Sequence, residues 1–170
     1  MSTASLSDPA SAALLEAARD RSPAEGRRCH VLLDLLGTCD SVGRRLRREL
    51  ARKDLTESGF RLLALVVRRE PEAITPAVIS TTLGLTRPAV SALLGRLEVS
   101  GLVRRERAAP GRRIFAIRLT DRGRDAFATA LGHYRAMVAH LMSALDPAAI
   151  AVLDRACVRL RQLSSPVSST

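Results

Sequence analysis

The chain has 170 residues, 46% of them hydrophobic, which suffices for a domain with its own core and excludes a disordered tail. Aromatic residues make up only 2%, which argues against proteins that stack single-stranded bases on aromatic platforms. Lysine and arginine number 27 against 17 aspartates and glutamates, and this formal charge of +10 favours a polyanionic partner, either nucleic acid or an acidic membrane surface. Lys53 is the only lysine. This can be explained either by a GC-rich coding bias or by a preference for guanidinium groups that contact phosphates and base edges.

No membrane span or signal peptide is expected. The longest charge-free internal stretch, residues 73–86, has 14 residues, whereas a span needs about 18 apolar ones. No basic residue precedes Arg19, and no continuous apolar stretch lies near the N-terminus. Cys29, Cys39 and Cys157 are too few and too scattered for a disulfide framework, so we expect a reduced, cytoplasmic protein.

The N-terminal third is predicted to contain an arm and one long helix. Residues 1–26 mix Ser, Ala, Pro and Gly around one short helical pattern, Ala10 to Arg19, and indicate a flexible arm with one short helix. From about Arg27 to Arg52, apolar or small residues recur at alternating spacings of three and four, which is typical of a helix with one apolar stripe. The stripe consists of Cys29, Leu32, Leu36, Cys39, Gly43, Leu46 and Leu50.

Three shorter helices are predicted next, each opened by a capping signal. Thr56 is a candidate N-cap for the first, and Thr75-Pro76 for the second, which Gly84 is suited to end in a left-handed cap. The third opens at Thr86-Arg87-Pro88, where the N-cap is fixed only to within one position because a residue before proline avoids helical dihedrals. Its predicted inner face consists of Val90, Leu93, Leu94 and Leu97.

A β-hairpin and two further helices complete the predicted elements. Extended segments on either side of Pro110-Gly111, Leu102 to Arg107 and Arg112 to Leu119, predict the hairpin. Thr120 is expected to cap a long helix and Asp146-Pro147 a last one, while residues 164–170 are expected to be disordered. The apolar stripes of these two helices run through Phe127, Leu131, Tyr134, Val138, Leu141 and Leu145, and through Ile150, Leu153, Cys157 and Leu160.

Helix, tight turn, helix and hairpin, in this order, are typical of a winged helix-turn-helix. The second helix of such a motif needs an apolar inner face for packing and a small, polar outer face that fits the major groove. Arg87 can form a bidentate contact with guanine, and Thr86 and Ser91 can reach bases or phosphates. The predicted DNA-binding residues are Thr86, Arg87, Pro88, Ser91, Arg96, Arg112 and Arg113.

Positive charge is concentrated between residues 86 and 118, where eight arginines accompany only Glu98 and Glu106. A net charge of +6 beside the second helix is what a phosphate-tracking surface requires, and a guanidinium at a hairpin tip can enter the minor groove. Any single arginine here can equally belong to a solvated strand face. A second basic cluster, residues 44–53, is better explained as a solvated helix end near the negative pole of the helix dipole than as a contact with flanking phosphates.

Two sequence blocks at characteristic separation, LExxGLVxR at residues 97–105 and LTxxG at 119–123, resemble the MarR family of bacterial transcription regulators. The resemblance extends over about residues 27–163. It implies a homodimer that a small-molecule or oxidant signal releases from a palindromic promoter site, with an effector pocket between the first, second and fifth helices. It also implies that the helix from Thr86 is the recognition helix and that Arg113 is the wing-tip arginine. The family wing usually reads Asp-x-Arg, but Gly111 stands at the aspartate position, so either the wing is more flexible or Arg112 shares its role.

Dimer formation is also favoured by the stripe over residues 127–145, which is too long for a winged-helix domain to cover and requires a second copy. Two recognition helices would then meet half-sites one helical turn, roughly 34 Å, apart. The predicted interface residues are Leu32, Leu36, Leu131, Tyr134, Val138, Leu141, Leu153 and Leu160.

The cysteines allow two interpretations. All three lie on apolar stripes, where a buried thiol behaves as a small hydrophobic group. The alternative is redox sensing, as in the hydroperoxide-sensing branch of the resembled family, although the aromatic cluster of that branch is not obvious here. Cys29, flanked by Arg28 and His30, is the candidate sensor, and Cys157 is the candidate resolving thiol.

No metal, cofactor or catalytic site is expected. His133 and His140 lie seven residues apart, too far to chelate one ion, and the chain lacks GxSxG, P-loop, GxGxxG and HExxH motifs. The prediction is a mainly α fold with a small β-hairpin wing: a winged helix-turn-helix domain at 54–120 and a helical dimerisation region at 27–53 and 121–163. The favoured function is a sequence-specific repressor acting on double-stranded DNA, with an architectural DNA-binding protein or a protein–protein adaptor as alternatives.

Overall fold

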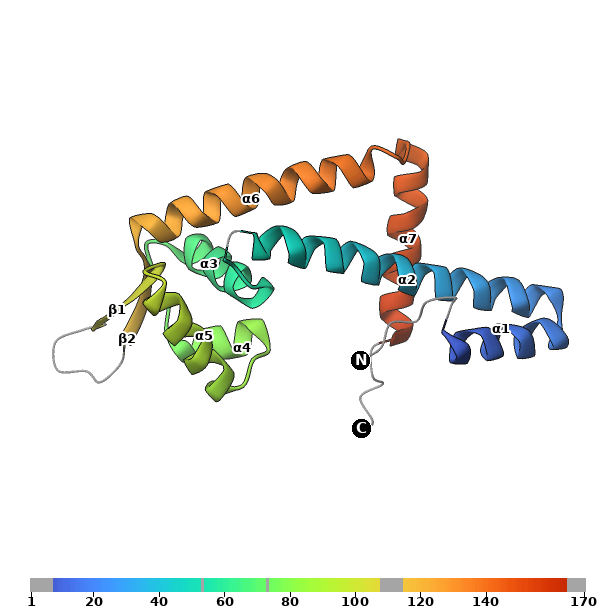
Figure 1. Cartoon of the computed structure of the whole chain (residues 1–170), viewed down its shortest axis with the longest axis horizontal. Helices are drawn as coiled ribbons and strands as arrows, with labels where there is room; N and C mark the ends of the chain where they lie inside the picture. The colour runs from blue at the N-terminus through green and yellow to red at the C-terminus, as the bar shows by residue number, and fades with distance from the viewer. Residues whose placement is uncertain (1–7, 53, 73, 108–114, 165–170) are drawn as a thin grey trace. The chain divides into compact units, whose positions relative to one another are not determined.

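The computed structural model describes residues 8–52, 54–72, 74–107 and 115–164, which form seven α-helices and two β-strands (Figure 1). The chain divides into two compact units, Met1–Phe127 and Ala128–Thr170, so α6 begins in the first and ends in the second. The elements are α1 Pro9–Arg21, α2 Pro23–Ala51, α3 Glu57–Arg69, α4 Pro76–Leu83, α5 Arg87–Val99, β1 Val103–Arg107, β2 Phe115–Leu119, α6 Asp121–Met142 and α7 Pro147–Ser164.

The structure confirms the helical pattern predicted at Ala10 to Arg19, but this helix is packed and is not part of a flexible arm. Residues 9–21 form α1, which packs against α2 and buries Leu15, and α2 already begins at Pro23 instead of near residue 27. The physical reason is local, because Asp8 and Ser22 are N-caps that are each followed by a proline at the first helical position. Gly26 allows the close approach of the two helices, since a Cβ atom there would lie 2.6 Å from the Arg19 Cγ.

The helix-turn-helix forms at the predicted capping residues. The hydroxyl groups of Thr56, Thr75 and Thr86 each accept a hydrogen bond from a backbone N–H three residues later. Thr86 is therefore the N-cap of α5, which resolves its start to one position and makes Arg87 its first residue. Gly84 ends α4 with φ at 65°, a left-handed conformation that glycine adopts without steric cost.

The core of the first unit lies among α3, α4, α5 and the hairpin. Val90, Leu93, Leu94 and Leu97 on α5 are all buried, which confirms the predicted inner face of this helix. The side chains that complete this core are Leu55, Leu62, Leu63, Val66, Ile74, Ile79, Leu102, Val103, Ile117 and Leu119.

The hairpin is antiparallel, with Val103 opposite Leu119 and Arg107 opposite Phe115. The strands confirm the predicted mainly α fold with a small β-hairpin. The predicted Pro-Gly turn and the candidate contact residues Arg112 and Arg113 lie outside the described residues.

Thr120 joins the hairpin to α6 and explains the LTxxG block in physical terms. Its hydroxyl group donates to the Gly101 carbonyl oxygen at 2.6 Å and accepts from the Gly123 N–H at 3.0 Å. A Cβ atom on Gly123 would lie 2.0 Å from the Leu102 carbonyl oxygen, so only glycine fits where α6 passes this strand. Phe127 continues the packing by stacking on Phe60 of α3, with ring centroids 5.4 Å apart.

The second unit contains the rest of α6 and α7. Asp146 caps α7, as predicted, by accepting a hydrogen bond from the Ala149 N–H at 2.7 Å. No residue of α7 is buried, and its apolar side chains are exposed in the single chain. These exposed side chains belong to Ile150, Val152, Leu153, Val158, Leu160 and Leu163.

Over the part of the chain that the structure describes, no helix alone is long and apolar enough to cross a membrane. Two pairs of consecutive helices, α4 with α5 and α6 with α7, are together long and apolar enough for a span by length and composition only, but they are bent by 113° and 106°.

Candidate nucleic-acid interface

The outer face of α5 is open to solvent. Thr86, Arg87, Pro88, Ser91 and Arg96, which the sequence predicts to contact DNA, lie on this side of the helix, and Thr86 alone is already engaged in a cap. Its hydroxyl oxygen accepts the capping hydrogen bond from the Ala89 N–H at 3.4 Å. The helix therefore presents small and polar side chains on one side and buries its leucines on the other, as entry into a major groove requires.

A hollow of about 200 Å³ lies beside this outer face. It brings together the start of α4, the outer face of α5 and the first strand of the hairpin. The residues that line it are Pro76, Ala77, Arg87, Val90, Ser91, Leu94 and Arg105.

The arginines around this surface fall into two groups. Arg105 is paired with Glu98 of α5 at 2.9 Å, and Arg104 and Arg118 are both paired with Glu106. Among the described residues, no carboxylate oxygen lies within 4.0 Å of the guanidinium groups of a second set, which consists of Arg87, Arg96 and Arg107. This second set keeps its full charge for an external anion, whereas the first set is partly neutralised within the protein.

Arg107 is a candidate contact residue that the sequence prediction counted in the charge cluster but did not single out. It lies at the last described position of β1, where it faces Phe115, whose side chain is also exposed. Only the strand register and the ion pairs of the structure distinguish Arg107 from the other arginines, because sequence alone does not show which arginines have a carboxylate partner.

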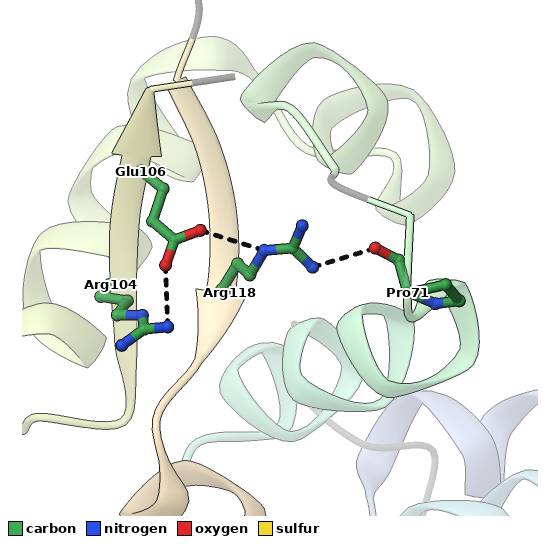
Figure 2. Close-up of polar contacts among 4 residues, drawn as sticks. All are labelled: Pro71, Arg104, Glu106 and Arg118. Carbon is green, nitrogen blue, oxygen red and sulfur yellow. Dashed lines mark hydrogen bonds and ion pairs between the residues drawn. The ribbon is translucent and has the colours of Figure 1, made fainter. Parts of the chain in front are cut away.

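The base of the hairpin contains a three-residue charge network (Figure 2). Glu106 receives the Arg104 guanidinium on one carboxylate oxygen at 2.8 Å and the Arg118 Nε on the other at 3.1 Å. Arg118 also donates from Nη1 to the backbone carbonyl oxygen of Pro71, in the connection between α3 and α4, at 3.0 Å. The hairpin is thereby attached to the loop that leads into the helix-turn-helix.

The second basic cluster, at the end of α2, is partly paired with carboxylates near it in the chain. Arg44 contacts Asp40, and Arg52 contacts Glu49 at 3.0 Å. Pairs at these spacings support the interpretation as a solvated helix face. Lys53 lies outside the described residues.

The candidate redox residues differ in exposure. Cys29 and Cys157 are half-buried, whereas Cys39 is exposed in the single chain. On the same helix Leu33 is buried, while Leu32 and Leu36, which the sequence assigns to the dimer interface, are exposed. Redox chemistry at Cys29 and Cys157 stays a prediction.

The candidate dimer residues remain at the surface of the single chain. Leu32 and Leu36 on α2, Leu131 and Val138 on α6, and Leu153 and Leu160 on α7 are exposed, and Tyr134 and Leu141 are half-buried. Their contact with a second copy stays a prediction.

Comparison with known proteins identifies the segment that carries this interface. Residues 53–114 match the family model of the MarR family. The HTH-type transcriptional regulator TtmR of Methylorubrum extorquens (strain PA1) is 42% identical over 84 residues, which make up 49% of this chain and 42% of TtmR. This segment is therefore similar to the MarR family. The chain thus matches less than half the length of that curated relative.

Solved structures are similar over a larger part of the chain. The YusO protein of Bacillus subtilis has a TM-score of 0.70 and 20% identity, and the match covers 83% of this chain and 99% of YusO. The Staphylococcus aureus MepR–DNA complex has a TM-score of 0.63 and 21% identity, covering 74% of this chain and 90% of MepR. At these identities the likeness shows the fold alone, and it agrees with the resemblance seen in the sequence blocks.

Proposed function

We propose that this protein is a transcription regulator that binds double-stranded DNA sequence-specifically through α5 and the hairpin. The observation that carries the proposal is the exposed outer face of α5, with Arg87, Ser91 and Arg96 beside a hairpin rich in arginine. MepR, which is similar in fold, has been solved bound to DNA, and TtmR is named as a transcriptional regulator. In this reading α5 is the recognition helix and contacts base edges, while Arg107, Arg112 and Arg113 contact the flanking backbone or minor groove.

The proposed active form is a homodimer on a palindromic site. This is supported by α7, which leaves a row of apolar side chains exposed in the single chain and buries no residue. Exposed apolar side chains on α2 and α6 point to the same need for a partner. A two-fold dimer presents two copies of α5 to two half-sites, and therefore requires a palindromic target.

The proposed mode of action is repression that ends when a small molecule or an oxidant changes the protein. Partial exposure of Cys29 and Cys157 supports access of an oxidant to both thiols. A repressor of this kind lowers transcription from its bound promoter until the signal reduces the affinity for DNA.

The decisive experiment is the selection of bound sequences from a random duplex library by the full chain, followed by titration of the selected site. A regulator is expected to bind it roughly 10³-fold or more tightly than unrelated duplex at the same salt concentration. An architectural protein would bind all duplexes with similar affinity and a steep salt dependence. An adaptor would bind none.

The same titration, repeated after mild peroxide treatment, tests the oxidant signal. We expect weaker binding and loss of the free thiol at Cys29, and Cys29→Ser is expected to keep its affinity under peroxide. Unchanged affinity with a Cys29 thiol that still reacts with an alkylating reagent would refute this signal, and a reporter assay would then be used to test other effectors.

A further inference from the structure

The charge network at the base of the hairpin contains an acidic side chain where DNA binding would disfavour one. Glu106 is the only carboxylate on the described residues of β1 and β2, and it lowers the positive charge of the hairpin by one. On a surface that attracts phosphate, a carboxylate reduces the long-range attraction. Its position therefore needs a reason other than direct contact with DNA.

The strand register supplies that reason. Arg104 lies directly opposite Arg118, and two like charges at such a position repel each other. Glu106 lies on the same face, two residues along β1, and its two oxygens contact one arginine each. The repulsion is thus replaced by two charge-assisted hydrogen bonds, which also fix the direction of the Arg118 guanidinium.

Arg118 then connects the hairpin to a different element. Its Nη1 donates to the Pro71 carbonyl oxygen at 3.0 Å (Figure 2). One residue earlier, the Ile117 N–H donates to the Ile74 carbonyl oxygen at 2.8 Å. Strand β2 is therefore attached at two consecutive residues to the loop that leads into α4. These two attachments set the tilt of the hairpin relative to the helix-turn-helix.

The same loop is attached to the start of α6. Glu70 accepts a hydrogen bond from the Arg124 guanidinium in the first helical turns, and this contact raises the pKa of Arg124 further above its already high usual value. Arg124 therefore keeps its positive charge. The loop is consequently held on both sides, by β2 and by α6.

The distances show why tilt matters at the far end of the hairpin. Phe115, which faces Arg107, lies three positions before Arg118, and an extended strand covers about 10 Å over that length. A tilt of about 10° would displace the Arg107 end by about 2 Å, more than a hydrogen bond to a phosphate tolerates. The base of the hairpin thus controls contacts that it does not itself make.

We propose that Arg118 and Glu106 are positioning residues for DNA binding, which hold the hairpin at the tilt that lets its outer arginines reach the duplex. The proposal rests on the proposed DNA-binding function and adds to it residues that act without touching DNA. For the substitution of Glu106, the proposal predicts weaker DNA binding, whereas the change in charge alone predicts tighter binding.

The test compares Glu106→Gln, Arg118→Met and the double variant with the wild-type full chain on the selected operator, over a range of salt concentrations. Glu106→Gln removes a negative charge, so an electrostatic role alone predicts tighter binding. Positioning predicts roughly tenfold weaker binding, because Arg104 and Arg118 again repel each other and Arg118 loses its fixed direction. Glu106 and Arg118 act through the same contact network. The double variant is therefore expected to bind DNA about as tightly as whichever single variant binds less tightly, and not more weakly.

The salt dependence separates positioning from the loss of one phosphate contact. Each neutralised phosphate contributes about 0.9 to the slope of log affinity against log salt concentration. Glu106→Gln removes no cation, so a smaller slope for this variant means that other arginines have lost their contacts. For Arg118→Met, positioning predicts a decrease of more than about 0.9 per protomer, which one lost cation cannot produce.

The matched control is Glu72→Gln, which removes a carboxylate from the same loop. Glu72 is highly exposed and contacts only Arg69 loosely, at 3.8 Å, so its substitution should leave binding unchanged or slightly tighter. Hydrogen exchange tests the folded state directly: exchange should rise in peptides covering β1 and β2 of the Glu106 and Arg118 variants, and stay unchanged in peptides covering α3.

The outcomes distinguish this proposal from the proposed function. Tighter or unchanged binding by Glu106→Gln, with wild-type binding intact, overturns the positioning role and leaves the regulator function standing. A wild-type chain that binds no duplex overturns both. Faster exchange throughout α3 in the variants would show a general loss of stability and would also contradict a role confined to the hairpin.

Discussion

At the scale of single residues, the arginines near α5 differ in what holds them. Arg105 and Arg118 contact carboxylates on other strands or helices, while Arg87 and Arg107 have no carboxylate partner among the described residues. The sequence predicted the cluster correctly as a whole, but it could not divide it, because ion pairs between elements depend on strand register and helix packing. The division matters since only unpaired guanidinium groups carry their full charge to a phosphate.

Arg87 and Arg113 should affect DNA binding in different ways. Arg87 is the first residue of α5 and is exposed where base edges would lie, so Arg87→Ala should cost about 1–3 kcal/mol and relax specificity at one base pair of each half-site. Arg113, the wing arginine by family resemblance, should contribute equally on all sequences, so Arg113→Ala should lower the affinity for specific and unrelated duplex by the same factor.

Titrations of both variants against the selected site, its single-base variants and unrelated duplex provide the measurement. Arg21→Ala is the matched control, since it removes one arginine from α1, where the side chain is 79% exposed. A uniform loss for Arg87→Ala would mean that this residue contacts phosphate instead of a base. Full affinity in Arg113→Ala would remove that residue from the interface.

At the scale of elements, local signals proved sufficient wherever a helix begins or ends. Thr56, Thr75 and Thr86 cap their helices as predicted, because an N-cap depends only on a side chain and an N–H three residues away. The same signal at Asp8-Pro9 and Ser22-Pro23 gives the starts of α1 and α2, which the prediction of an arm with one short helix did not use.

The phase of the α2 stripe could not be predicted in the same way. Leu33 is buried while Leu32, one residue away, is 47% exposed. An apolar residue on a helix can face its own chain or a second one, and sequence spacing does not distinguish the two. For the same reason, the sequence alone does not show which surface the apolar side chains of α7 contact.

Gly123 provides a stability prediction for the junction of hairpin and helix. A Cβ atom there would lie 2.0 Å from the Leu102 carbonyl oxygen, and a backbone atom cannot move aside without displacing β1 or α6. We expect Gly123→Ala to lower the free energy of unfolding by about 3 kcal/mol or more, which corresponds to a melting temperature lower by roughly 6–12 °C.

Gly132 is the matched control, because it lies on the same helix and, apart from its chain neighbours and its own helix backbone, no atom of the described residues lies within 4 Å of its Cβ position. Gly132→Ala should raise stability by up to about 1 kcal/mol, since alanine is the better helix former. Thermal melting followed by circular dichroism measures both variants. A Gly123→Ala protein as stable as the wild type would show that α6 can shift away from Leu102 at little cost.

At the scale of the whole molecule, charge and apolar surface are separated along the chain. Of the net charge of +10, +6 lies between residues 86 and 118, whereas the exposed apolar side chains lie mainly on α2, α6 and α7. The first feature fits a polyanion and the second fits a protein partner. A dimer joined through these helices can therefore keep the arginine-rich surface of each copy available for DNA.

Charging the α6 stripe should separate these two properties. Val138 is 41% exposed and Leu141 lies one turn further on the same face, so Val138→Asp with Leu141→Asp would place four carboxylates in a two-fold interface. We expect monomers by light scattering after size exclusion, with affinity for the palindromic site reduced at least about 100-fold. Each monomer should retain weak binding to a single half-site, because α5 and the hairpin are unaltered.

The control pair is Thr129→Asp with Ala136→Asp, which adds the same charge to exposed positions on the opposite face of α6. This variant should remain dimeric and bind the operator as tightly as charge repulsion allows, within a few-fold of the wild type. A dimer that persists in the Val138 and Leu141 variant would place the interface on other residues. Monomers that bind the full palindrome with unchanged affinity would show that recognition needs only one copy of the chain.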